Sequence, residues 1–279
     1  MCRSFEEDGG EAMIRDITIG QYYSCESPIH KMDPRTKILW VVFYMIWLFV
    51  IDSALSYLAV ILMTAIIIKA SNVPLKFIVR GLKPIVLIVI FTALLNLFLT
   101  KGETVLFSKG IFTITKEGTY LAVNMAVRIV LLIMGTSLLT FTTTPTVLTG
   151  GLELLLKPLK KIGIPVSVFV MMMSIALRFI PTLLDETDKI IKAQTSRGAD
   201  FEHGNPIKRV KAMLPILIPL FVSAFRRADE LAIAMECRCY NSDGKRTSFR
   251  KFTFGKFDLY ALVYAVIMCA ILIVLKVVQ

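Results

Sequence analysis

Five apolar segments constrain the fold of this chain more than any other feature of its sequence. They cover residues 38–51, 54–68, 85–99, 120–141 and 259–275. A helix that crosses the hydrocarbon core of a bilayer needs roughly 20 mostly apolar residues, within a range of about 17 to 25. Hydrophobic residues make up 56% of the chain, which is more than a soluble domain needs to fill its core. The sequence therefore predicts a polytopic helical membrane protein.

The first two apolar segments are short, and two arrangements of them must be compared. They form either one long helix broken at Asp52 and Ser53 or two helices that fold back as a hairpin. Only the hairpin leaves both flanking basic clusters on one side of the membrane, as the positive-inside rule requires. We therefore expect the hairpin. The predicted spans lie at about 36–52, 54–69, 84–100, 119–141 and 257–279.

The distribution of charge predicts how the chain is divided between membrane and water. The formal net charge is +11, and most basic residues lie outside the predicted spans, which places the N-terminus and the segment 142–256 in the cytoplasm. We expect an all-α polytopic membrane protein with about five transmembrane helices. Its parts are a disordered or extended N-terminus (1–15), a membrane domain with four spans (16–141), a cytoplasmic domain of long amphipathic helices (142–256) and a last span (257–279). The sequence leaves open whether the natural start is Met1 or Met13.

Arg128 lies inside the predicted fourth span, where an ionisable side chain is costly. Such a residue can mark a substrate or proton path through the membrane. The alternative interpretation, which we favour, is that Arg128 faces the interior of the bundle. There it would bind backbone carbonyl groups or Asn124, one helical turn away.

The cytoplasmic segment predicts three helices. Residues 146–161 have leucines on one face with lysines nearby, which is typical of a helix that lies at a membrane surface. Two longer helices follow at about 165–198 and 206–240, and each opens on a proline. Both begin apolar and become charged, and both finish with an arginine between two small residues. These two motifs consist of Ser196, Arg197 and Gly198, and of Cys237, Arg238 and Cys239.

Methionines lie on the apolar portions of both long helices. Met171, Met172 and Met173 belong to the first helix and Met213 to the second. Flexible thioethers suit a surface that accepts differing partners. They serve equally well as filling for an intramolecular core, and the sequence does not decide between these interpretations.

Several chemical functions are disfavoured by residue spacing. Cys237 and Cys239 lack the further Cys or His ligands that a tetrahedral metal site needs. Asp185 and Asp188, in the run DETD, resemble half of a magnesium-diphosphate motif, but they lie four residues before lysines, which favours a solvated face. No phosphate-binding loop or hydrolytic motif is present in the sequence. The basic run 245–251 precedes the last span, so we expect it to contact lipid headgroups rather than nucleic acid.

The two arginine motifs, SRG at 196–198 and CRC at 237–239, lie on successive long helices after four predicted spans and before a final one. In this arrangement the chain resembles the transmembrane T component of energy-coupling factor (ECF) transporters, the EcfT or CbiQ-like family. The opening stretch 16–40, with Asp-Pro-Arg-Thr-Lys before the first span, and RFIPTLLDETDKI at 178–190 are also similar to that family. One position departs from the pattern: Cys239 stands where a glycine is usual, so we expect a different cap on the second helix.

The resemblance implies a noncatalytic scaffold of a vitamin or metal-ion importer in a prokaryotic cell membrane. Its partners would be two ABC-type ATPases and an exchangeable substrate-binding membrane subunit, the S component. ATP and Mg would be bound by the ATPases, with no cofactor on this chain. Arg197 and Arg238 would enter grooves on the two ATPases, and the long helices would transmit ATPase closure to the S component. The methionines would contact that subunit.

Two other functions remain open from sequence. One is a membrane enzyme acting on lipid-linked or diphosphate substrates through Asp185, Asp188 and Arg128. The other is a self-contained secondary carrier centred on Arg128. Such carriers usually contain repeated halves, and the predicted spans show no repeat.

Overall fold

The computed structural model describes residues 22–51, 53–100, 104–109, 112–163, 165–199, 206–241 and 253–277. These residues form two compact units, and each is considered by itself. The first unit contains the described residues up to Leu155 together with those from 253 onward, and the second contains those from Leu156 to Asn241. The predicted N-terminal region 1–15 and the basic run at 245–251 lie outside the described residues.

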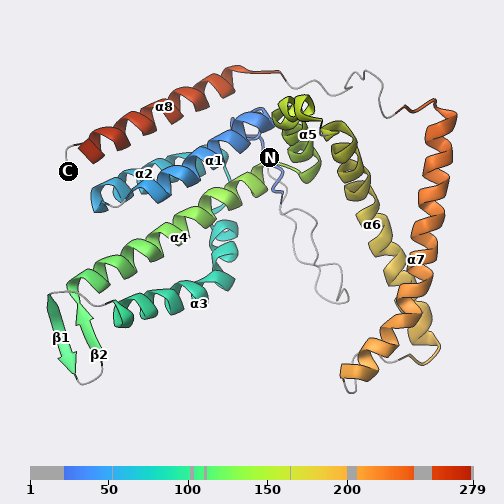
Figure 1. Cartoon of the computed structure of the whole chain (residues 1–279), viewed down its shortest axis with the longest axis horizontal. Helices are drawn as coiled ribbons and strands as arrows, with labels where there is room; N and C mark the ends of the chain where they lie inside the picture. The colour runs from blue at the N-terminus through green and yellow to red at the C-terminus, as the bar shows by residue number, and fades with distance from the viewer. Residues whose placement is uncertain are drawn as a thin grey trace. The chain divides into compact units, whose positions relative to one another are not determined.

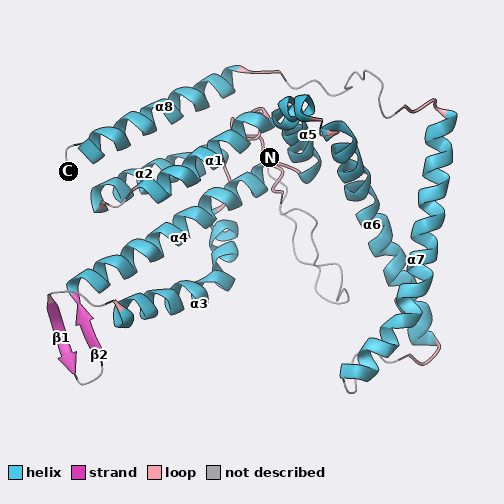
Figure 2. Cartoon of the chain, viewed as in Figure 1, coloured by secondary structure: helices cyan, strands magenta, loops and turns pink. Residues whose placement is uncertain are grey.

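The first unit is a helical bundle with one small hairpin (Figures 1 and 2). Its helices are α1 (Pro34–Val50), α2 (Ala54–Ser71), α3 (Leu75–Leu99), α4 (Lys116–Thr142), α5 (Pro145–Leu156) and α8 (Lys256–Val277). Strands β1 (Val105–Lys109) and β2 (Phe112–Thr115) pair antiparallel between α3 and α4. The fold class is that of an all-α polytopic membrane protein to which this hairpin is added.

Among the described residues, five helices are long and apolar enough to cross a membrane. They contain the stretches Ala54–Ser71, Gly81–Phe98, Lys116–Thr142, Val166–Ser196 and Lys256–Lys276. Four of these overlap spans predicted from the sequence, and the other is the first of the two long helices. The first half of this long helix is apolar all round, which makes the helix apolar enough to cross a membrane. Helix α1 has 17 residues, the lower end of the length that can span a bilayer.

Helices α1 and α2 fold back on each other and pack on α4. The Tyr44 hydroxyl of α1 donates to the Leu131 carbonyl at 3.1 Å and lies 3.2 Å from Oγ1 of Thr64 on α2. Tyr44 is 1% exposed, and Gly135 of α4 provides the space for its ring. These contacts belong to a buried cluster that also includes residues of α8. A single long helix over residues 38–68 is incompatible with them.

A buried polar cluster joins the ends of α1, α4 and α8. Asp258 Oδ1 accepts a hydrogen bond from the Asp33 backbone at 2.9 Å. The Lys37 ammonium donates to the Thr142 carbonyl at 3.0 Å and to Thr143 Oγ1 at 3.2 Å. Since Asp33 also caps α1 through the Arg35 amide, the Asp-Pro-Arg-Thr-Lys stretch fixes one end of this bundle.

Helix α5 is shorter than the predicted amphipathic helix at 146–161. It ends at Leu156, and the chain continues as a 3₁₀ turn over Lys157–Ile162. Pro158 has no N–H to donate and its ring hinders a regular α-helix, which accounts for the tighter turn. The turn closes at Gly163, whose φ is +88°.

The second unit contains two long helices, α6 (Val166–Ser196) and α7 (Pro206–Cys237). They run in opposite directions and cross, so that their C-terminal ends lie at opposite ends of the pair (Figure 1). Val166, Val170 and Ile216 are buried in this unit. Polar contacts between α6 and α7 lie farther along both helices, at Glu186 and Arg227.

Candidate functional site

The C-terminus of α6 presents the first arginine motif through a left-handed cap. Gly198 has φ +87°. Its amide donates to the Thr195 carbonyl at 2.9 Å, and the Ala199 amide donates back to the Gln194 carbonyl at 3.0 Å. This pattern satisfies carbonyl groups that the end of a helix would otherwise leave unpaired. The cap holds Arg197 at the last turn.

The C-terminus of α7 ends in the same way. The Cys239 amide donates to the Glu236 carbonyl at 2.9 Å, and the Tyr240 amide donates to the Met235 carbonyl at 3.0 Å. Cys239 has φ +53° and occupies the place that Gly198 has on α6. The expectation of a different cap on the second helix is therefore wrong. Two backbone hydrogen bonds impose the left-handed conformation, although the residue is not glycine.

Both arginines are exposed at these caps. Ser196, Arg197 and Gly198 are exposed, as are Cys237, Arg238 and Cys239. Among the described residues, neither guanidinium group has a hydrogen-bond or ion-pair partner. A cation at this position interacts favourably with the negative end of the helix dipole. The geometry leaves the donor fork of each arginine available to a second molecule.

The crossing of α6 and α7 separates the two motifs. The two helices are in contact at Glu186 and Arg227, whose charged groups lie 2.9 Å apart. Arg197 lies eleven residues after Glu186, and Arg238 lies eleven residues after Arg227. At 1.5 Å of rise per residue each arm is about 16 Å long. Since the arms point toward opposite ends of the pair (Figure 1), the arginines are up to roughly 33 Å apart. They cannot enter one groove on a single small surface.

The predicted methionines lie on two exposed apolar surfaces, one on each long helix. Met172, Met173 and Met213 are 54%, 42% and 54% exposed, and Met171 is half-buried. Sequence reasoning missed most of the surface on α7. Its other members on that helix are Leu214, Leu217, Ile218, Phe221, Val222 and Phe225. Their i, i+3, i+4, i+7 spacing is the signal that could have identified an apolar face.

Arg128 is bound inside the first unit and takes no part in this site. Its Nε donates to the Tyr57 hydroxyl at 3.0 Å, and its Nη2 donates to the Ile51 carbonyl at 2.9 Å. The guanidinium also lies 5.8 Å from the centre of the Phe49 ring. The favoured interpretation is confirmed in its main point, since a backbone carbonyl is a partner, and the residue joins α4 to the turn between α1 and α2.

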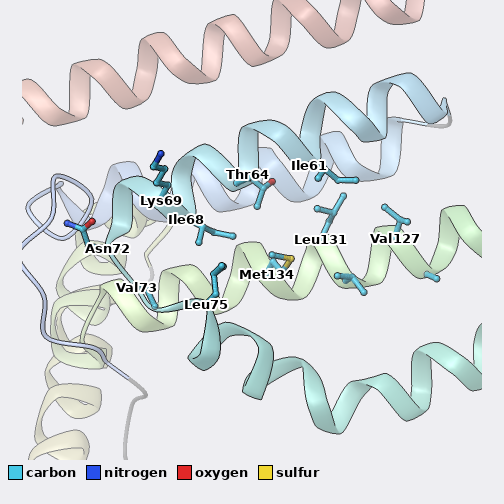
Figure 3. Close-up of a pocket in the computed structure, with 13 residues that line it drawn as sticks. Ile61, Thr64, Ile68, Lys69, Asn72, Val73, Leu75, Val127, Leu131 and Met134 are labelled. Atoms are coloured by element: carbon cyan, nitrogen blue, oxygen red, sulfur yellow. The ribbon is translucent and has the colours of Figure 1, made fainter. Parts of the chain in front are cut away.

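An apolar groove of about 730 Å³ lies between α2 and α4 (Figure 3). Ile68 of α2 and Leu131 and Met134 of α4 point into it, with Lys69 at one end. No carboxylate or histidine is among the described residues that line this groove. It contains none of the predicted site residues and offers no acid–base pair for hydrolytic chemistry.

The structure does not gather the carboxylates of the DETD run into a metal site. Asp185 is exposed and Asp188 is half-buried, whereas Glu186 between them accepts hydrogen bonds from Ser223 and Arg227 of α7. Within the described part of the chain, no group of three or more His, Cys, Asp or Glu side chains is placed to hold a metal ion. The enzyme hypothesis therefore gains no observation in its favour.

Comparisons with known proteins agree with this geometry. The model of the CbiQ family, described as cobalt transport protein, matches residues 25–249. A protein of Ruminiclostridium cellulolyticum named energy-coupling factor transporter transmembrane protein EcfT is 57% identical over 247 residues, covering 88% of this chain and 92% of that protein. Proteins of the same name from Clostridium kluyveri and Bacillus subtilis are 50% and 43% identical, covering 95% of this chain and 98% and 100% of theirs.

Fold and site together define a multi-pass membrane component of a transporter, whose exposed motifs lie on long helices outside the bundle of the first unit. The family is equally clear from the comparisons. The chain belongs to the EcfT or CbiQ-like family of energy-coupling factor transporter transmembrane proteins.

Proposed function

We propose that this chain is the scaffold subunit of an ECF-type importer for a vitamin or a metal ion. It couples ATP binding and hydrolysis by two partner ABC-type ATPases to movement of a substrate-binding membrane subunit. The observation that supports this most directly is the pair of matching caps, which present Arg197 and Arg238 at opposite ends of one helix pair. Two separated, equivalent docking points suit two ATPase subunits.

The chemistry of arginine supports docking into a groove. A guanidinium group stays charged and offers a planar fork of donors that matches a carboxylate. The flanking residues Ser196, Gly198, Cys237 and Cys239 are all small, so each arginine can enter a narrow groove without steric hindrance. Removal of such an arginine leaves its carboxylate partner buried and unpaired, which costs about 2–5 kcal/mol of binding.

The exposed apolar surfaces of α6 and α7 support contact with the S component. On α7, Met213 lies with Phe221 and Phe225, which are 60% and 68% exposed, and on α6 Met172 is also exposed. Aromatic and methionine side chains are enriched in protein interfaces. Because methionine adapts to differing shapes, these surfaces suit a subunit that exchanges. Movement of α6 and α7 would then be transmitted to the S component.

The proposed orientation places the N-terminus and the long helices in the cytoplasm, where the ATPases bind ATP and Mg. The basic residues that flank the first two helices include Lys31, Arg35 and Lys69, and an excess of Lys and Arg is typical of cytoplasmic flanks. This chain itself would bind no cofactor and no nucleic acid, and membrane lipid would surround its spans.

Co-purification tests this proposal. The tagged chain, extracted in a mild detergent, is expected to carry two nucleotide-binding proteins with it. Arg197→Ala combined with Arg238→Ala should abolish their recovery, because each substitution removes one docking point. Arg226→Ala, at an exposed position of α7, is the matched control and should leave recovery unchanged. Undiminished recovery with the double variant would refute the docking role of the arginines.

A further inference from the structure

Within the DETD run, the carboxylate of Glu186 forms hydrogen bonds with described side chains of α7. It accepts a hydrogen bond from the Ser223 hydroxyl and another from Arg227 Nη2 at 2.9 Å. The Glu186 and Arg227 side chains are 24% and 37% exposed, so the pair lies at the contact between the helices and is partly open to solvent. Asp185 and Arg226, their neighbours in sequence, are exposed.

The position of this contact along the helices is symmetrical. Glu186 precedes Arg197 by eleven residues, and Arg227 precedes Arg238 by eleven residues. Eleven residues correspond to about three helical turns. Arg197 therefore lies on nearly the same face of α6 as Glu186, and Arg238 lies on nearly the same face of α7 as Arg227. The contact between the two helices thus lies midway between their two C-terminal ends. Glu186 and Arg227 therefore occupy equivalent positions and carry opposite charges.

Directional bonds at one point of a crossing have a specific mechanical effect. Side chains on either side of the contact are apolar, such as Leu220 and Leu231, and apolar packing alone tolerates sliding of one helix along the other. A carboxylate held by a hydroxyl and a guanidinium group fixes the register, because the bonds are short and oriented. Rotation about the contact remains possible while translation is opposed.

We infer that Glu186, Ser223 and Arg227 form the pivot of the α6–α7 pair and are positioning residues for coupling. The pivot keeps the arms to Arg197 and Arg238 equal, so that a displacement of one cap changes the angle at which α6 and α7 cross without sliding one helix along the other. The inference rests on the proposed function for its role in transport. The pivot itself is a property of this chain and can be measured without any transported substrate.

Spin labels on the two arms measure the pivot directly. Cysteines for labelling are placed at Lys192 and Ile233, both exposed and each six residues beyond its pivot residue, with the five natural cysteines replaced by serine. The label-to-label distance is recorded in the complex with the co-purified ATPases, with and without ATP and orthovanadate. The unaltered pivot should give one narrow distance distribution that shifts with nucleotide.

Glu186→Gln and Arg227→Gln should each broaden this distribution and abolish the shift, while the ATPases still co-purify. The reversed pair, Glu186→Arg with Arg227→Glu, should restore both properties, because the opposite charges meet again. Asp185→Asn and Arg226→Gln are the matched controls and should behave like the parent. A narrow, shifting distribution in both single variants, or no recovery in the reversed pair, would overturn the inference.

Failure of the pivot and failure of the proposed function give different results. If no ATPase accompanies the parent chain, the proposed function fails, and the width of the distribution in the chain alone still tests the pivot. If the ATPases bind to the parent chain and the pivot variants give the same distance distributions as the control variants, the pivot fails while the proposed function stands.

Discussion

Gly198 and Cys239 close two matching caps with different residues. Both have positive φ, +87° and +53°. For a residue with a Cβ atom the left-handed conformation costs roughly 1–2 kcal/mol, and glycine avoids this cost. A Cβ atom added at Gly198 would meet nothing within 4 Å, so a substitution there would be strained by the backbone alone. The cap of α7 carries a conformational cost that the cap of α6 avoids.

Replacing Cys239 by glycine should stabilise the cap of α7. The expected gain of about 1 kcal/mol slows hydrogen exchange of the Tyr240 amide roughly fivefold, because this amide is released when the cap opens. Gly198→Ala should speed exchange of the Ala199 amide by a similar factor. Cys237→Gly, inside the helix, is the control and should bring no gain. Unchanged or faster exchange of Tyr240 in Cys239→Gly would contradict this account of the cap.

His30 makes the fold of the segment before α1 dependent on pH. Its Nε2 lies 3.0 Å from the Tyr23 carbonyl and its Nδ1 lies 2.7 Å from the Ser27 hydroxyl. A neutral ring with the proton on Nε2 satisfies both contacts. Burial lowers the pKa of His30 below its ordinary value of 6.5, and the nearby Lys37 charge lowers it further. As the pH falls below about 6.5, the unfolded chain takes up a proton first.

Stability from His30 is therefore fully present above its ordinary pKa of 6.5 and is lost as the pH falls toward the lower pKa of the folded state. Thermal unfolding midpoints of the purified protein between about pH 8 and about pH 5 measure this dependence. His30→Gln should show a shallower decline on acidification than the parent. Equal slopes for the two proteins would mean that His30 contributes nothing to the pH dependence.

Helices α1 and α4 approach closely at Gly135. A Cβ atom added at this glycine would lie 2.5 Å from Cε1 of Tyr44, which is 1% exposed and bonded to the Leu131 carbonyl. Small residues at helix contacts allow such an approach in membrane bundles.

Gly135→Ala is expected to destabilise the bundle by about 1–3 kcal/mol through overpacking. Gly81→Ala is the matched control, because its added Cβ atom would lie 3.9 Å from the nearest side chain and alanine favours a helix. Thermal unfolding of both variants in one detergent provides the measurement. If Gly135→Ala unfolds at the same temperature as Gly81→Ala, the close packing of Tyr44 has no energetic importance.

Helix locations were predictable from sequence to the extent that apolar runs reveal them. The span predicted at about 84–100 lies in helix α3, which begins earlier, at Leu75; the first turns of this helix are basic, so they fell outside the apolar run. Contacts between helices were less predictable. Local spacing paired Asp185 and Asp188 with lysines on the same helix, whereas the ion pair of this region joins Glu186 to Arg227. The local spacing of residues along the sequence does not reveal which distant side chains meet in the fold.

The residues of the candidate site could be proposed from the sequence, whereas their geometry could not. Two small-Arg-small triplets marked Arg197 and Arg238. Their matching caps depend on backbone conformation at Cys239, which propensity argues against. Their placement at opposite ends depends on how α6 and α7 cross, and no local pattern encodes this.

The whole molecule divides its tasks between its two units. The first unit holds the buried clusters and four of the five candidate spans. The second unit exposes an apolar surface on each of α6 and α7 and presents an arginine at each end of the pair. A scaffold that transmits motion needs such a separation, because the moving helices must be free to contact partners while the bundle stays packed.

Site-specific cross-linking tests the central claim most directly. A thiol-reactive photo-cross-linker is attached to Glu236→Cys near Arg238, or to Thr195→Cys near Arg197, both exposed and outside the small-residue motifs, with the natural cysteines replaced by serine. Lys160→Cys in the 3₁₀ turn, also exposed, is the control. The account predicts that each of the two sites beside an arginine captures an ATPase subunit and that the control does not. Capture of lipid alone at both sites would contradict it.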